Sequence, residues 1–71
     1  NPVSDKLHVV SGSAISRVTV YNSTGNSMLV LSNIREKELE MNTAGLSPGL
    51  FTIKIETSSG VQVQKFIKSP R

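Results

Sequence analysis

The chain has 71 residues, a net charge of +3 and no cysteine. This length allows one domain, which buries only about 60% of the surface that its unfolded chain exposes, so we expect a thin core. The lack of Cys excludes disulfides, a cysteine-based metal site and a thiol nucleophile. The chain is 37% apolar and 18% charged, which favours a folded segment over a disordered one. No apolar run approaches the roughly 20 residues of a membrane helix.

The N-terminal part predicts two short strands and a turn. Within residues 5–10, Leu7 and Val9 lie on one side and Lys6 and His8 on the other, which is typical of a short half-buried strand. The Ser-Gly-Ser of residues 11–13 is expected to end it. Residues 15–22 alternate again and are rich in β-branched side chains, which predicts a second strand. Residues 22–27 are typical of a turn, in which Gly25 is free to take a positive φ.

The middle of the chain predicts two more strands. Residues 28–32 are apolar on both faces, which indicates a central strand covered on both sides or one that is partly shielded at an edge. Residues 34–42 contain good helix formers, so a helix competes there. Leu39 and Met41, however, alternate with charged residues and no second helical turn of apolar residues follows. We therefore predict a strand.

The clearest hairpin lies near the C-terminus. Pro48 and Gly49 suit the two central positions of a type II turn. The strand that follows alternates apolar residues with polar ones, and its predicted inward side chains are Phe51, Ile53 and Ile55.

The last strand, residues 61–68, changes its apolar phase. Val61 and Val63 indicate that odd-numbered positions face inward, whereas Phe66 has the opposite parity. We expect either a β-bulge near residues 64–65 or a strand end that is covered on both faces. Short strands at close spacing with turn residues between them predict an antiparallel β-sandwich.

The sequence offers little material for catalysis or metal binding. Hydrolases need a nucleophile, a base and a group that orients the base, and the chain has one His and one Asp, His8 and Asp5. We interpret His8 as a surface residue. Glu38 and Glu40 share one strand face, but calcium takes six to eight oxygen ligands. We expect no catalytic residue, no metal and no cofactor.

Two further patterns have ordinary explanations. Residues 22–24, Asn-Ser-Thr, match the N-glycosylation sequon, but such residues more often simply form a turn. Lys65, Lys68 and Arg71 lie near the C-terminus, where they would suit a phosphate or an anionic lipid. Because the three aromatic residues of the chain do not form a stacking platform, we expect no nucleic-acid binding.

Four blocks in a fixed order carry a resemblance to a known family. They are NPVSDKLHV at residues 1–9, ISRVTVYNSTGNSMLV at 15–30, LEMNTAGLSPGLFTIKIET at 39–57 and GVQVQKFIK at 60–68. Together they resemble the type A C-terminal sorting domain of the type IX secretion system of Gram-negative bacteria. The positions that match the family motifs include Asn1, Pro2, Gly25, Leu46, Gly49, Phe51, Gly60, Lys65, Phe66, Ile67 and Lys68. Pro48 is a further turn position, beside Gly49.

The chain departs from the family pattern at three places. The usual Pro before Asn1 is missing, Phe51 stands where Tyr is commoner, and residues 69–71 extend past the usual Lys ending. That extension leaves open how the last strand is presented to the secretion machinery.

The resemblance implies a fold and a role. The fold is an immunoglobulin-like antiparallel β-sandwich of about seven short strands, formed by residues 1–71 as a single domain at the C-terminus of a longer secreted protein. The domain directs its cargo from the periplasm across the outer membrane to the cell surface. A sortase-like peptidase then removes the domain, by a cut expected upstream of Asn1, and attaches the cargo to anionic lipopolysaccharide. The domain is a ligand of the machinery and not an enzyme.

We hypothesise that the outer-membrane translocon recognises the terminal strand, which the hairpin of residues 50–68 ties into the sandwich. The residues expected to carry this recognition are Lys65, Phe66, Ile67 and Lys68, which the hairpin would hold in a fixed conformation. Backbone pairing at this strand edge would give affinity with little sequence demand. An exposed edge would also allow a homodimer.

Two alternatives remain open from the sequence. One is an adhesion or carbohydrate-binding sandwich, for which a cluster of exposed aromatics or a metal-ligand loop is expected and neither is present. The other is an uncleaved, surface-retained domain that holds anionic glycolipid through Lys65, Lys68 and Arg71.

Overall fold

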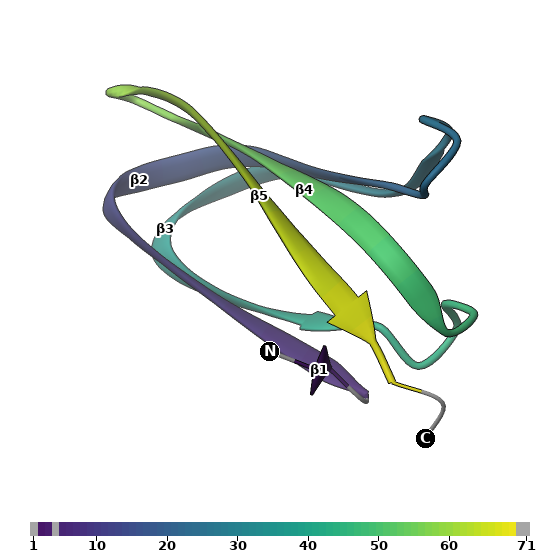
Figure 1. The fold of residues 1–71 in the computed structure, drawn as a ribbon. Helices are drawn as coiled ribbons and strands as arrows, with labels where there is room; N and C mark the ends of the chain where they lie inside the picture. Colours follow the sequence, from purple (N-terminus) through teal and green to yellow (C-terminus); the bar gives the residue numbers. More distant parts are fainter. Residues whose placement is uncertain (1, 4, 70–71) are drawn as a thin grey trace.

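The computed structural model describes residues 2–3 and 5–69, and these residues form an all-β structure. The strands are β1 (Pro2–Val3), β2 (Lys6–Tyr21), β3 (Ser27–Asn42), β4 (Gly49–Thr57) and β5 (Gly60–Lys68). They lie in one sheet of order β1-β5-β4-β2-β3, in which β1 runs parallel to β5 and all other neighbours are antiparallel (Figure 1). Nowhere in these residues is there a helix long and apolar enough to span a membrane.

Two of the strands are long and bent. β2 and β3 have 16 residues each. The sequence predicted two short strands in the region of β2, at residues 5–10 and 15–22, and two in the region of β3, at residues 28–32 and 34–42. The expected breaks are bends: the β2–β3 register shifts between Val10 and Ile15, and Asn33 and Arg35 take φ values of 57° and 58°. A left-handed residue turns the chain out of the strand direction. The described residues therefore form five strands and not about seven.

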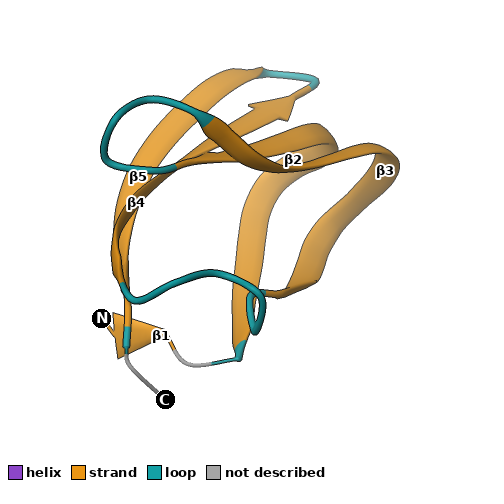
Figure 2. Ribbon diagram, turned by 90° about the vertical axis from the view of Figure 1, so that its right-hand side faces the viewer, coloured by secondary structure: helices purple, strands orange, loops and turns teal. Residues whose placement is uncertain are grey.

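The bends give the sheet two layers. In the first layer, Ile15–Tyr21 of β2 lies between β4 and the N-terminal half of β3, and β5 lies beyond β4. The second layer contains Lys6–Val10 of β2, paired with Glu38–Asn42 of β3. Figure 2 shows the β2–β3 hairpin curving from one layer into the other.

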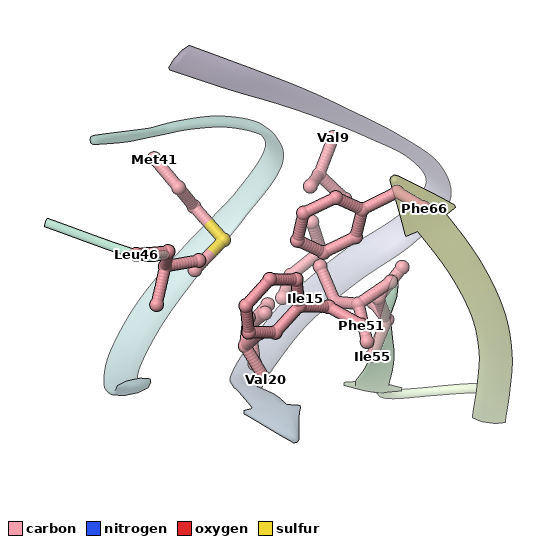
Figure 3. Packing of buried hydrophobic residues seen from close by; sticks show 10 residues of the cluster. Val9, Ile15, Val20, Met41, Leu46, Phe51, Ile55 and Phe66 are labelled. Carbon is pink, nitrogen blue, oxygen red and sulfur yellow. The ribbon is translucent and has the colours of Figure 1, made fainter. Parts of the chain in front are cut away.

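The core lies between the two layers. Its buried apolar residues are Val9, Ile15, Val18, Val20, Met41, Leu46, Phe51, Ile53, Ile55 and Phe66. The inward alternation predicted for β4 is confirmed, because Phe51, Ile53 and Ile55 are all buried. Met41 of β3 and Leu46, which follows it in the chain, close the core from the other side (Figure 3).

The phase predicted for the last strand is wrong. β5 pairs with β4 in an unbroken register from Thr57 and Gly60 at the turn to Phe51 and Phe66, so there is no bulge. The rings of Phe51 and Phe66 stack with centroids 5.5 Å apart, which places Phe66 in the core. Val61 and Val63 then face away from the core and are 57% and 62% exposed. Cover on both faces is also absent, because Ile67 is 52% exposed.

Of the two interpretations of residues 28–32, the central strand covered on both sides is wrong, and the partly shielded edge strand is closer to the structure. β3 is the last strand of the sheet order, so this segment lies at an edge. Met28, Val30 and Leu31 are exposed, and only Leu29 packs against the core. One face of this strand points toward the core, and no part of the described chain covers the other face. Both faces nevertheless carry apolar side chains.

The turn predicted after β2 is confirmed. The Asn22 side-chain oxygen accepts hydrogen bonds from the backbone N–H groups of Thr24, at 3.1 Å, and Asn26, at 2.9 Å. It also accepts one from the Thr24 hydroxyl, at 2.8 Å. Gly25 takes a φ of 90°. Asn22 and Thr24 therefore form the turn itself, which is the ordinary explanation of the sequon.

The second predicted turn lies a few residues earlier than expected. The Leu46 N–H donates to the Thr43 carbonyl at 3.0 Å, and the Ala44 N–H donates to the Asn42 side chain at 2.9 Å. Gly49 does take a positive φ, 147°, but it is already the first residue of β4.

Gly25→Ala should destabilise the domain by about 1 kcal/mol, because an L-residue in the left-handed region costs that much. In a domain of this size the expected fall in melting temperature is about 4–8 °C. Gly12→Ala is the matched control, because Gly12 has no atom within 4 Å of an added Cβ and lacks a left-handed φ. Thermal unfolding followed by circular dichroism measures both, and equal shifts would contradict the assignment of strain to Gly25.

Candidate recognition surface

The side of β4 and β5 that faces away from the core forms a distinct surface, here called the outer face. The cross-strand pairs on it are Leu50 with Ile67, Thr52 with Lys65, Lys54 with Val63 and Glu56 with Val61. The same face continues over β2 and β3, where Thr19 pairs with both Lys54 and Val30. These positions alternate with the core positions Phe51, Ile53 and Ile55.

The outer face collects most of the exposed aliphatic side chains. Among the described residues, eight large hydrophobics are exposed, and five of them lie on this face. These five are Val30, Leu50, Val61, Val63 and Ile67. The Thr52–Lys65 pair separates Leu50 and Ile67 from Val63, so a polar pair interrupts the aliphatic side chains of the face. Exposed apolar side chains that gather on one face mark interaction sites more often than scattered ones do. The outer face is therefore the strongest candidate for a binding surface.

The charges on the outer face are mostly basic. Its basic residues are Lys65 and Arg17, which are exposed, and Lys54, which is half-buried. Among the outer-face positions of β4 and β5, Glu56 is the single acidic residue. Glu56 lies directly opposite Arg17 in the β2–β4 register. The surface therefore combines aliphatic contact area with an excess of positive charge.

The four residues predicted for translocon recognition separate into two pairs. Lys65 and Ile67 are exposed on the outer face. Phe66 and Lys68 are 7% and 5% exposed and point to the opposite side of β5. Because an extended strand alternates its faces, a partner on the outer face would contact Lys65 and Ile67, and Phe66 would act through the fold.

The remaining motif residues have structural positions. Gly25, Gly49 and Gly60 all have positive φ, Leu46 and Phe51 are buried, and Pro48 is exposed directly before β4. Pro2 belongs to β1, which pairs with the end of β5. Asn1 lies outside the described residues.

The polar clusters considered in the sequence are ordinary surface pairs. His8 Nε2 lies 3.1 Å from Glu38 Oε1, and Lys6 Nζ lies 3.7 Å from Glu40 Oε1, across the β2–β3 ladder. All four side chains are more than half exposed. In the part of the chain that is described, no three His, Cys, Asp or Glu side chains come together to hold a metal.

The comparison with protein families agrees with the resemblance. The family described as secretion system C-terminal sorting domain matches residues 1–69 of the chain. The chain therefore belongs to this family, the C-terminal sorting signals of type IX secretion. No curated protein and no solved structure shows significant similarity to it.

Family membership defines the role in general terms. A type IX sorting signal interacts with the type IX secretion machinery and implies export across the outer membrane, to the cell surface or beyond. The family is one of sorting signals and not of enzymes.

Proposed function

We propose that the outer face, centred on Lys65 and Ile67 of β5, is the surface by which the type IX translocon recognises this sorting domain. The observation that supports the proposal is the gathering of exposed aliphatic side chains on one face of the terminal hairpin. Such side chains cost solubility in a free domain, and a partner that covers them gains the hydrophobic contribution of their burial.

The complete pathway that we propose follows from the family. Residues 1–71 form one C-terminal domain of a longer secreted protein. In this proposal the two layers of the domain are those of an immunoglobulin-like sandwich. The cargo passes through the periplasm, the translocon binds the folded domain, and the cargo crosses the outer membrane. A sortase-like peptidase then removes the domain upstream of Asn1 and joins the cargo to anionic lipopolysaccharide.

The rival glycolipid-binding module has less support from side-chain exposure. It requires Lys65, Lys68 and Arg71 to meet an anionic surface together. Lys68 is buried in the described structure, and Arg71 lies outside the described residues. Dimerisation through strand edges stays a prediction.

A fusion of a signal peptide, a fluorescent protein and residues 1–71 tests the proposed function. In a bacterium with a working type IX system we expect fluorescence at the cell surface or in the medium. In a strain without the translocon we expect it in the periplasm. Periplasmic fluorescence in both strains, with the domain folded, would contradict the proposal that this segment is a sufficient sorting signal.

A further inference from the structure

A groove lies between the two layers beside β5. Its floor is formed by Val9 of β2, Ile53 and Ile55 of β4 and Phe66 of β5, all of which are buried. Val10 and Gln64 are exposed at its rim. The cavity in the groove measures about 90 Å³.

Both strands that border the groove have a backbone edge without a strand partner. On the side away from β4, β5 pairs only with β1, at Ile67 and Lys68, so residues 60–66 have no neighbouring strand there within the described chain. β2 pairs with β4 only from Ile15 onward, so residues 6–10 have β3 on one side and, among the residues that the structure describes, no strand on the other. Unpaired N–H and C=O groups along an edge are ready to pair with another strand.

We propose that an extended segment of the secretion machinery adds to the sheet in this groove, pairing its backbone with β5 along residues 61–65. This inference rests on the proposed function, because it takes the partner from the type IX system. An extended chain is the ligand that satisfies a row of backbone groups while alternate side chains enter a pocket.

The groove also defines the chemistry of the added strand. Its cavity of about 90 Å³ is smaller than the roughly 150 Å³ cavity that holds a benzene ring. One small aliphatic side chain of the segment therefore enters over the floor, and an aromatic one does not. Among the described residues that line the groove, Lys65 carries a positive charge and none is acidic, whereas His8 is already paired with Glu38, whose Oε1 lies 3.1 Å from His8 Nε2. Charge complementarity favours acidic residues beside the aliphatic one.

The groove adjoins the outer face along one strand. Lys65 lines the groove and also belongs to the outer face. A single partner can therefore cover the outer side chains of β5 and pair with its edge at the same time, which gives two separable contributions to binding.

Proline substitution in β5 tests the added strand. Backbone N–H groups point alternately to either side of an antiparallel strand. Of the two variants Val63→Pro and Gln64→Pro, one therefore loses an N–H at the free edge of β5, and the other loses an N–H that bonds to β4. Loss of the bond to β4 lowers the melting temperature, which identifies the edge variant. We expect the variant that keeps the wild-type melting temperature to export the fluorescent fusion about tenfold less. Threonine at the same position removes the same side chain but keeps the N–H, so the threonine variant should export markedly more than the proline variant.

Each outcome of this comparison has one meaning. Normal export of the folded proline variant overturns the added strand. Equal loss with threonine also overturns it and assigns recognition to the side chain. Failure of the wild-type fusion to leave the periplasm contradicts the proposed function instead.

A second variant tests the groove without touching the backbone. Val10→Phe places a ring at the rim, and we expect about the same tenfold loss of export with the melting temperature unchanged. Met28→Phe is the control, because Met28 is also exposed but does not line the groove. Equal export of the two variants overturns the inference.

Discussion

Replacing Phe66 by alanine will unfold a large fraction of the domain. The Phe66 side chain is 7% exposed and stacks on Phe51 with an interplanar angle of 18°. Truncation of a buried Phe costs about 3–5 kcal/mol, and a core of this size rarely supplies more than about 3–5 kcal/mol of stability. The melting temperature should fall by at least about 12 °C, since about 4 °C is lost for each kcal/mol.

The adjacent residue provides the control. Ile67 is 52% exposed on the outer face, so Ile67→Ala should change the free energy of unfolding by no more than about 0.5 kcal/mol. Urea unfolding followed by circular dichroism measures both variants. Similar losses for the two would show that Ile67 is part of the core and would contradict the outer face as defined.

The position of Phe66 also affects how the end of the chain can be tested. Deleting the residues from Lys65 onward removes a core side chain together with the exposed ones. A truncated domain that is not exported is therefore explained by unfolding alone. Single substitutions that leave Phe66 in place separate recognition from folding.

The phase of β5 shows what sequence patterns can and cannot predict here. The alternation on β4 identified Phe51, Ile53 and Ile55 as inward, and the structure confirms it. Because β4 and β5 are joined through two residues, odd positions on β4 pair with even positions on β5, such as Phe51 with Phe66. This pairing rule would have placed Phe66 in the core, which is correct. The apolar pattern of Val61 and Val63 predicted the opposite face instead. Hydrophobic periodicity does not distinguish a core from an exposed binding face.

The bends in β2 and β3 could not be predicted in the same way. Asn tolerates the left-handed region better than most residues, which suits Asn33, but no local signal favours it at Arg35. The second layer is held by packing of Val9 and Met41 onto the core, which depends on residues far apart in the sequence. The all-β class follows from local patterns, whereas the number of strands depends on these contacts.

Ile67→Glu should stop export while the domain stays folded. Ile67 lies opposite Leu50 at the end of the outer face, so a glutamate there is solvated in the free domain. In the proposed complex the partner would cover the carboxylate beside Leu50 and remove it from water, and burying a charge without a full set of hydrogen bonds costs several kcal/mol. Since about 1.4 kcal/mol changes an equilibrium tenfold, exported protein should fall by at least about tenfold.

The same substitution at another exposed aliphatic position gives the matched comparison. Leu31 is 38% exposed and pairs with Val18, so it lies on the core side of β3 and not on the outer face. Leu31 also does not line the groove beside β5. Leu31→Glu therefore adds the same charge without touching either proposed contact.

The most direct test is the location of the fluorescent fusion carrying Ile67→Glu or Leu31→Glu in a bacterium with a working type IX system, together with the melting temperature of each purified domain. Recognition through the outer face predicts that the folded Ile67→Glu fusion stays in the periplasm and the folded Leu31→Glu fusion is exported. Export of both folded variants to the same extent would contradict it.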